Sequence, residues 1–389
     1  MFSERLRDLR LAKGLTLDAV AGLMNGQVTK QALSKYEHGA ALPRPKTLAA
    51  LAVALGVKAS ALVAEPVYEI ELLQYRTRAP MRVRSKEHFE AALKVKLERR
   101  LQLEDRLCMA RRPGLPAHPR PVSTLDDVEA AAAKVRALWG LGTAPIANLT
   151  DVLETRSIHV FEMDGDADFD GLAAVARDES RDLRAVGIAE NPDTAGDRQR
   201  FNLAHELGHV AMAPGTELDD EAAASRFAGA LLLPAELVKS EVGERRSEIS
   251  LEELIALKQL WGVSIQCILH RLCELSVITE SVYDWWYREI DALGYRIVEP
   301  ASLPREHSSW EQRNLARAAS EGILSREQVA VYAGERKLAA HGDGIDRRAL
   351  SRLKAADRRV VLREHAERLA ASYEGTSDEW LEADLDDPR

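Results

Sequence analysis

The 389-residue sequence is poor in cysteine and has no long apolar run. Its three cysteines, Cys108, Cys267 and Cys273, are too few and too scattered for a disulfide framework or a cysteine-based metal site. No apolar run approaches the roughly 20 residues that a membrane helix needs. The sequence begins MFSERLRDLRLAKG, where charge alternates with leucine, unlike a secretory signal peptide. We therefore expect a cytoplasmic protein that does not contact a membrane.

The charges are unevenly distributed along the chain. The formal net charge is −9, yet residues 1–65 hold nine lysines and arginines against five acids, and residues 76–120 hold thirteen against five. A basic N-terminal third on an acidic protein favours a nucleic-acid contact at that end and argues against coating of DNA by the whole chain. A hydrophobic fraction of 46% and a charged fraction of 30% predict a packed globular protein.

The patterning predicts an α+β fold that is mostly α-helical. Residues 1–65 are typical of five short helices, with Thr16 and Thr29 as helix caps. Residues 66–119 form a basic, mostly helical linker that ends in the Pro/Gly-rich RRPGLPAHPRP. In residues 120–280, three short runs (SIHVFEM, GLAAVARD and LRAVGIAEN) predict a small three-stranded sheet between helices. Residues 281–389 are predicted to be helical, and no internal repeat is found.

A histidine pair marks the most informative segment, RQRFNLAHELGHVAMAP. On a helix, positions i and i+4 share one face, so His205 and His209 can direct one ring nitrogen each at a single ion. Glu206 lies one step round the helix, where it can accept a proton from a water molecule that attacks a carbonyl. Zinc with three protein ligands keeps a position for that water. The same five-residue pattern also arises by chance on surface helices, so the neighbouring segments are needed to distinguish a zinc site from a chance pattern.

A third ligand is expected from the following segment, ELDDEAAASRFAGALLLP. Glu221, 12 residues after His209, is the first choice, and Glu217, Asp219 and Asp220 are the alternatives. Ser225 lies one turn beyond Glu221, where it can hydrogen-bond to a metal ligand.

The two segments DRQRFNLAHELGH and EAAASRFAGALLLP resemble the ImmA/IrrE family of zinc metallopeptidases. The strand FDGLA, which precedes them, also resembles the family, and the likeness spans about residues 120–280. It implies a zincin-like domain of gluzincin type and an extended peptide substrate bound at an edge strand of the sheet.

The resemblance also implies roles for individual residues. His205, His209 and Glu221 would bind one Zn²⁺ per chain, and Glu206 would be the catalytic base. Two positions depart from the family pattern. Asn202 replaces the common threonine, and Ser225 replaces the usual Asn or Asp, which implies a weaker hydrogen bond to the zinc-binding helix.

Residues 3–64 resemble an Xre-type, lambda-repressor-like helix-turn-helix domain. The resemblance implies that the third helix enters the major groove of a double-stranded DNA operator. The turn MNGQVT is about two residues longer than the common form. The residues expected to face bases or phosphates are Thr29, Lys30, Gln31, Ser34 and Lys35. A helical bundle that binds protein and recruits substrates is the alternative. The basic stretch 76–120 either adds phosphate contacts or is a solvated helix face.

Two further features bear on regulation. A thiolate is a strong zinc ligand, so Cys108 can act as a switch that occupies the open metal position, although an incidental thiol accounts for it as well. LKAADRRVVLREHAERLAASYEG and the acidic end that follows it resemble the partner-binding tails of small antitoxins, which suggests a toxin partner. A helical cap on the peptidase is the alternative.

Together these features predict a DNA-binding transcriptional regulator with a zinc endopeptidase domain. Its expected substrate is a helix-turn-helix repressor, whose cleavage would switch on stress, mobile-element or defence genes. The alternative is a non-proteolytic repressor or antitoxin in which the zinc fold is a sensor or binds a partner. A homodimer is compatible with either function.

Overall fold

Five short helices form the N-terminal part, as predicted. They are α1 (Phe2–Ala12), α2 (Leu17–Leu23), α3 (Lys30–Glu37), α4 (Pro45–Ala54) and α5 (Ala59–Val63). The computed structural model describes residues 2–77, 82–109, 111–116, 118–163 and 169–332. The hydroxyls of Thr16 and Thr29 accept backbone hydrogen bonds at the starts of α2 and α3, so both predicted caps are confirmed. Leu6, Leu33 and Leu51 are at the centre of the small core that these helices share.

The central sheet has one strand more than the sequence predicts. It contains β1 (Glu69–Thr77), β3 (Ile158–Glu162), β4 (Phe169–Arg177) and β5 (Leu183–Glu190), in the order β1-β4-β5-β3. β4 pairs antiparallel with β1 and β5, whereas β3 runs parallel to β5. β1 lies in the segment predicted to be a helical linker. Its alternation of exposed Glu69 and Glu71 with half-buried Ile70 and Leu72 suits an edge strand with one buried face.

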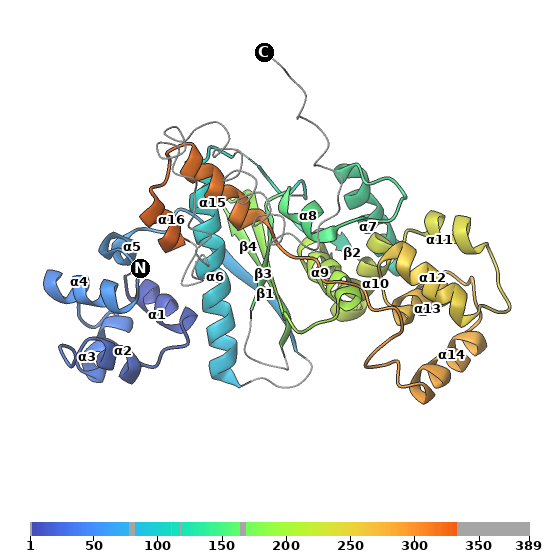
Figure 1. The fold of residues 1–389 in the computed structure, drawn as a ribbon, viewed down its shortest axis with the longest axis horizontal. Helices are drawn as coiled ribbons and strands as arrows, with labels where there is room; N and C mark the ends of the chain where they lie inside the picture. Colours follow the sequence, from blue (N-terminus) through green and yellow to red (C-terminus); the bar gives the residue numbers. More distant parts are fainter. Residues whose placement is uncertain (1, 78–81, 110, 117, 164–168, 333–389) are drawn as a thin grey trace, which may run out of the picture. The chain divides into compact units, whose positions relative to one another are not determined.

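Helices cover both faces of this sheet. α6 (Val83–Arg106) packs on one face, and α9 (Gly196–Ala211) packs on the other (Figure 1). β4 and β5 are buried along nearly their whole length, which is why their sequences are almost continuously apolar. Successive residues alternate between the two layers, because Leu172 and Ala174 pack with α6 while Ala173 and Val175 pack in the core around α9.

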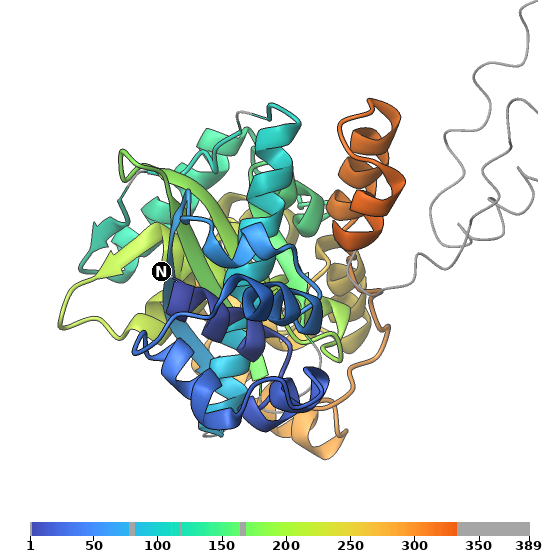
Figure 2. The same cartoon turned by 90° about the vertical axis from the view of Figure 1, so that its left-hand side faces the viewer.

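α6 packs against two hydrophobic cores, one beneath the sheet and one among the N-terminal helices. Leu93 and Leu97 point into the core under the sheet, whereas Val95 packs against the N-terminal helices. Glu98 pairs with Arg5, and the carbonyl of Leu11 lies 2.7 Å from the His88 ring. Figure 1 shows α6 between the N-terminal helices and the sheet, and Figure 2 views the molecule with the N-terminal helices in front. The predicted helix is confirmed, but it is not a solvated linker.

The remaining helices enclose α9. α10 (Asp220–Leu232) packs against α9 and α7 (Leu125–Trp139), with α8 (Leu149–Glu154) nearby. A short parallel pair of β2 (Arg120–Val122) and β6 (Met212–Pro214) joins the start of this region to the end of α9. Outer helices follow: α11 (Ala235–Val242), α12 (Leu251–Trp261), α13 (Ile265–Glu274) and α14 (Glu280–Ala292). No described helix is both long and apolar enough to cross a membrane.

The described C-terminal region contains an unpredicted non-helical segment. Residues 299–309, called the strap here, lie between α14 and α15 (Trp310–Ser320), and α16 (Arg326–Tyr332) follows. The Glu306 carboxylate accepts hydrogen bonds from two backbone amides at the start of α8. Trp310 is buried edge-on against His159 of β3. The antitoxin-like segment of the sequence lies outside the described residues.

Gly196→Ala is predicted to lower the free energy of unfolding by about 1–3 kcal/mol, as overpacking typically does. A Cβ at Gly196 would collide with the backbone carbonyl of Pro304 in the strap, and backbone cannot yield as a side chain can. The control is Gly22→Ala in exposed α2, where no atom lies within 4 Å of the added Cβ. This control should raise the free energy of unfolding by about 0.5–1 kcal/mol, because glycine inside a helix is less favourable than alanine. Urea unfolding followed by circular dichroism measures both, and equal midpoints for Gly196→Ala and wild type would contradict the packing.

Candidate metal centre and DNA-binding surface

Three side chains from two helices converge on one point. His205 and His209 lie on one face of α9, with their Nε2 atoms 3.2 Å apart. Glu221, in the first turn of α10, places its two carboxylate oxygens 3.2 Å from His205 Nε2 and 3.5 Å from His209 Nε2. His205 is fully buried, whereas the Glu221 side chain is 50% exposed. In the part of the chain that the structure describes, this is the only group of three His, Cys, Asp or Glu ligand atoms close enough to share a metal.

The donor set and its spacing suit zinc. Two ligand atoms of a tetrahedral zinc ion are about 3.3 Å apart, given zinc–nitrogen bonds of about 2.0–2.1 Å. The three observed separations bracket that value without rearrangement. Of the four acids considered from the sequence, Glu221 joins the histidines, and Glu217 and Asp219 do not. The site can therefore hold one ion with two imidazoles and one carboxylate.

The other nitrogen of each imidazole has a polar neighbour on α10. Ser225 Oγ lies 3.3 Å from His205 Nδ1, one turn beyond Glu221, and forms a hydrogen bond with it. Asp220 Oδ2 lies 3.4 Å from His209 Nδ1, within ion-pair distance, although no hydrogen bond joins these two atoms. A hydrogen bond to the outer nitrogen orients the ring so that Nε2 faces the ion, as Ser225 does for His205. Sequence analysis identified the contact of Ser225, but considered Asp220 only as an alternative ligand. Adjacent residues diverge by about 100° on a helix, so Asp220 and Glu221 can approach different atoms of the same site.

Glu206 is buried against the backbone of the sheet. It is 1% exposed, and an ideal Cβ on Gly171 of β4 would lie 2.7 Å from Glu206 Oε1. Any larger residue at position 171 would therefore displace the carboxylate. The resemblance of FDGLA to the family gives no physical reason for its glycine. The contact with Glu206 supplies one, because only glycine leaves room for the carboxylate.

The first turn of α9 is anchored by a buried ionic network. Lys258 bridges Asp197 of α9 and Glu299 of the strap. Burial lowers the pKa of the Lys258 ammonium, but hydrogen bonds to the two carboxylates outweigh it, so the pKa is raised. The start of α9 is therefore held in place by Lys258, which stays protonated and charged.

The second turn of α9 is held by the strap. Gln199 exchanges two hydrogen bonds with the backbone of Glu306, and buried Arg200 pairs with the Glu306 carboxylate at 3.3 Å. Burial raises the pKa of Glu190 to about 7, against the opposing hydrogen bond from Gln199 and the charge of Arg305. Of the two arginines that match the family motif, Arg198 is exposed, and Arg200 supports the helix that carries the histidines.

Cys108 is not brought to this site. It follows the C-terminal end of α6, is exposed, and has a positive φ of 51°. The histidine–glutamate cluster does not include its sulfur. The described arrangement therefore gives no support to a cysteine that occupies the open metal position.

The N-terminal helices present a polar surface along α3. Gln31 and Lys35 are exposed, as is Lys30, although the Lys30 ammonium lies 2.6 Å from Asp18. The hydroxyl of Thr29 caps α3, and half-buried Ser34 lies near His38. Gln31 and Lys35 are thus the most available of the predicted DNA contacts. The long turn before α3 includes Asn25 and Gly26, both with positive φ.

Ser225→Ala is predicted to weaken zinc binding by about 10- to 100-fold, the usual effect of removing a contact to a ligand's outer nitrogen. Ser225→Asn should restore much of the loss, because its amide oxygen can accept the His205 Nδ1–H bond. Ser240→Ala is the control, since Ser240 hydrogen-bonds within α11. Competition with a chromophoric chelator measures the affinities. Unchanged affinity in Ser225→Ala would show that the contact does not support the metal.

Comparison with known families finds a match in each of the two regions that contain these sites. The family model described as "IrrE N-terminal-like domain" matches residues 153–273, which include α9 and α10. The family model described as "Helix-turn-helix domain" matches residues 2–65, the five N-terminal helices. No curated protein matches the chain. The chain therefore joins an N-terminal helix-turn-helix domain to an IrrE N-terminal-like domain of the Peptidase_M78 family.

Proposed function

We propose that this protein is a DNA-binding regulator that cleaves a repressor-type protein with a zinc-dependent endopeptidase site. The observation that carries the proposal is the convergence of His205, His209 and Glu221 beside buried Glu206. The two family matches support a regulator that contains a peptidase-type domain. We infer that cleavage in the cytoplasm switches on stress, mobile-element or defence genes.

The chemistry divides between the ion and the protein. Zinc held by His205, His209 and Glu221 would supply Lewis-acid activation of the attacking water. Glu206 accepts a proton from that water and delivers it to the leaving amine as the peptide bond breaks. Ser225 orients the His205 imidazole by a hydrogen bond, Asp220 lies within ion-pair distance of the His209 imidazole, and the packing of β4 limits the movement of Glu206.

Glu206→Gln is predicted to lower the rate of substrate cleavage by about 10²- to 10⁴-fold, the usual contribution of a general acid–base group. The assay incubates zinc-loaded full-length protein with candidate helix-turn-helix repressors and detects products by mass spectrometry. Zinc content should be unchanged, since Glu206 is not proposed as a ligand. Glu241→Gln, an exposed substitution on α11, is the control. Equal cleavage by Glu206→Gln and wild type would refute the mechanism. Specific operator binding without any cleavage would favour a non-proteolytic repressor.

The α3 surface gives a separate prediction about DNA. Gln31→Ala should cost about 1–3 kcal/mol at the preferred operator and relax the preference at one base position. Lys35→Ala should weaken binding to all sequences and reduce the salt slope by about 1, as loss of a phosphate contact does. Lys134→Ala, exposed on α7, is the matched control. Titrations use duplexes selected in vitro at several salt concentrations. If neither variant alters binding, α3 is not the reading helix.

A further inference from the structure

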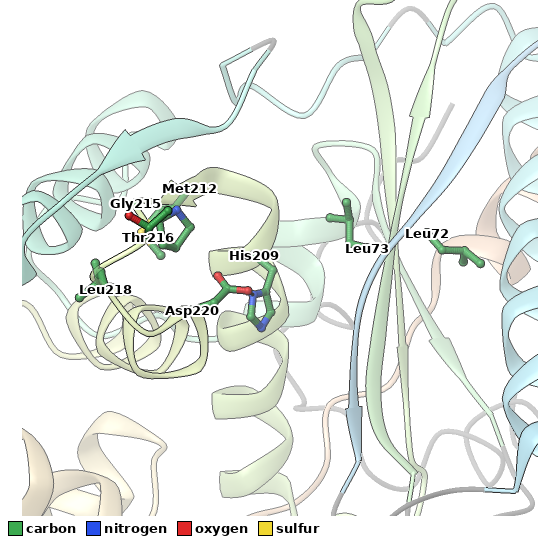
Figure 3. Close-up of a pocket in the computed structure, with 9 residues that line it drawn as sticks. Leu72, Leu73, His209, Met212, Gly215, Thr216, Leu218 and Asp220 are labelled. Atoms are coloured by element: carbon green, nitrogen blue, oxygen red, sulfur yellow. Dashed lines mark ion pairs between the residues drawn. The ribbon is translucent and has the colours of Figure 1, made fainter.

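A groove beside the candidate metal centre suggests which peptides the protein accepts. It has a volume of about 660 Å³ and lies between β1 and the segment from Met212 to Asp220 (Figure 3). His209 forms part of its wall, so the groove is continuous with the histidine–glutamate cluster. Whatever binds in it lies next to the proposed reaction centre.

One wall of the groove is the edge strand β1. In its antiparallel pairing with β4, Leu72 lies opposite Ala174 and Tyr75 opposite Leu172, so two residues, 73 and 74, stand opposite Ala173. Bulges of this kind redirect side chains and are frequent near active sites. Leu73 points towards His209, whereas Leu72 points away from it (Figure 3). No described strand pairs with the outer edge of β1, which leaves backbone groups for an added strand.

The opposite wall contains apolar side chains, and acidic side chains lie on the same segment. Met212 and Leu218 line the groove together with Leu73. Glu217 and Asp219 are exposed on the same segment, and Asp220 lines the groove itself. Together with Glu206 and Glu221, the region holds five carboxylates. A bound divalent ion would neutralise two of these negative charges, so the region would remain acidic. The nine described residues that line the groove include no lysine or arginine.

We propose that this groove binds an extended substrate segment with an aliphatic residue beside the scissile bond and basic residues near it. The aliphatic side chain lies between Leu73, Met212 and Leu218, and the basic residues face Glu217 and Asp219. The backbone of the substrate pairs with the outer edge of β1. This inference rests on the proposed endopeptidase function, for which it names the substrate class.

The test measures binding separately from cleavage. Zinc-loaded full-length Glu206→Gln is titrated with three fluorescein-labelled ten-residue peptides that differ at the test positions only. The first carries one leucine and two arginines, the second replaces both arginines by glutamate, and the third replaces the leucine by alanine. The first should bind about tenfold or more tighter than the third, as for an aliphatic group in an apolar pocket. It should also bind tighter than the second, by a ratio that falls as salt is added.

Groove variants assign these preferences to particular residues. Glu217 is exposed between the lining residues Thr216 and Leu218, so Glu217→Lys should reduce or invert the preference for arginine over glutamate. Glu241→Lys, on α11, should leave it unchanged. Leu73→Ala should remove the preference for leucine over alanine and retain the preference for arginine. Because each readout is a ratio between peptides on one protein, partial misfolding of a variant does not imitate it.

The outcomes separate the two proposals. If wild type cleaves substrate but the peptides bind equally, or if Glu217→Lys and Leu73→Ala leave both ratios unchanged, the groove inference is overturned and the peptidase proposal stands. If the peptide preferences hold but wild type cleaves none of these peptides or candidate repressors, the endopeptidase proposal fails. The groove is then a peptide-binding site.

Discussion

The candidate site depends on the close approach of α9 to the backbone of β4. Glu206 is buried against Gly171, where even a methyl group would meet its carboxylate. This contact lies on the face of α9 that packs against the sheet. His205 and His209 face α10, where Glu221 completes the cluster. The glycine in this strand thus leaves room for the Glu206 carboxylate on one side of α9, while both imidazoles face α10 on another.

Tight packing against a sheet requires support from the rest of the helix, and the strap supplies it. Glu299, Glu306 and Arg305 form ion pairs with residues on or beside the start of α9. The strap lies beyond residue 273, where the match to the IrrE N-terminal-like family ends. The domain in this chain is therefore completed by residues outside the part of the sequence that the family model recognises.

The sequence predicts local features well and long-range ones poorly. The caps at Thr16 and Thr29 and the helix with His205 and His209 follow from patterns within single helices. Spacing offered Glu221 together with three other acids, and the family resemblance selected it. β1 and the strap were missed because their conformations depend on partners about 100 residues away, β4 and α9. The role of Asp220 was missed for a related reason. Spacing shows which residues can approach a site, but not which atom each one contacts.

α6 packs against both domains, which limits how either domain could be replaced by one from another protein. Val95 belongs to the core of the helix-turn-helix domain, while Ala12 of α1 packs into the core under the sheet. A cut near residue 65 would therefore expose apolar surface on both fragments. A helix-turn-helix domain from another regulator would need to match this surface before it could replace the native one. The shape of one shared helix therefore constrains how either domain can be replaced, although the two domains are separate in the sequence.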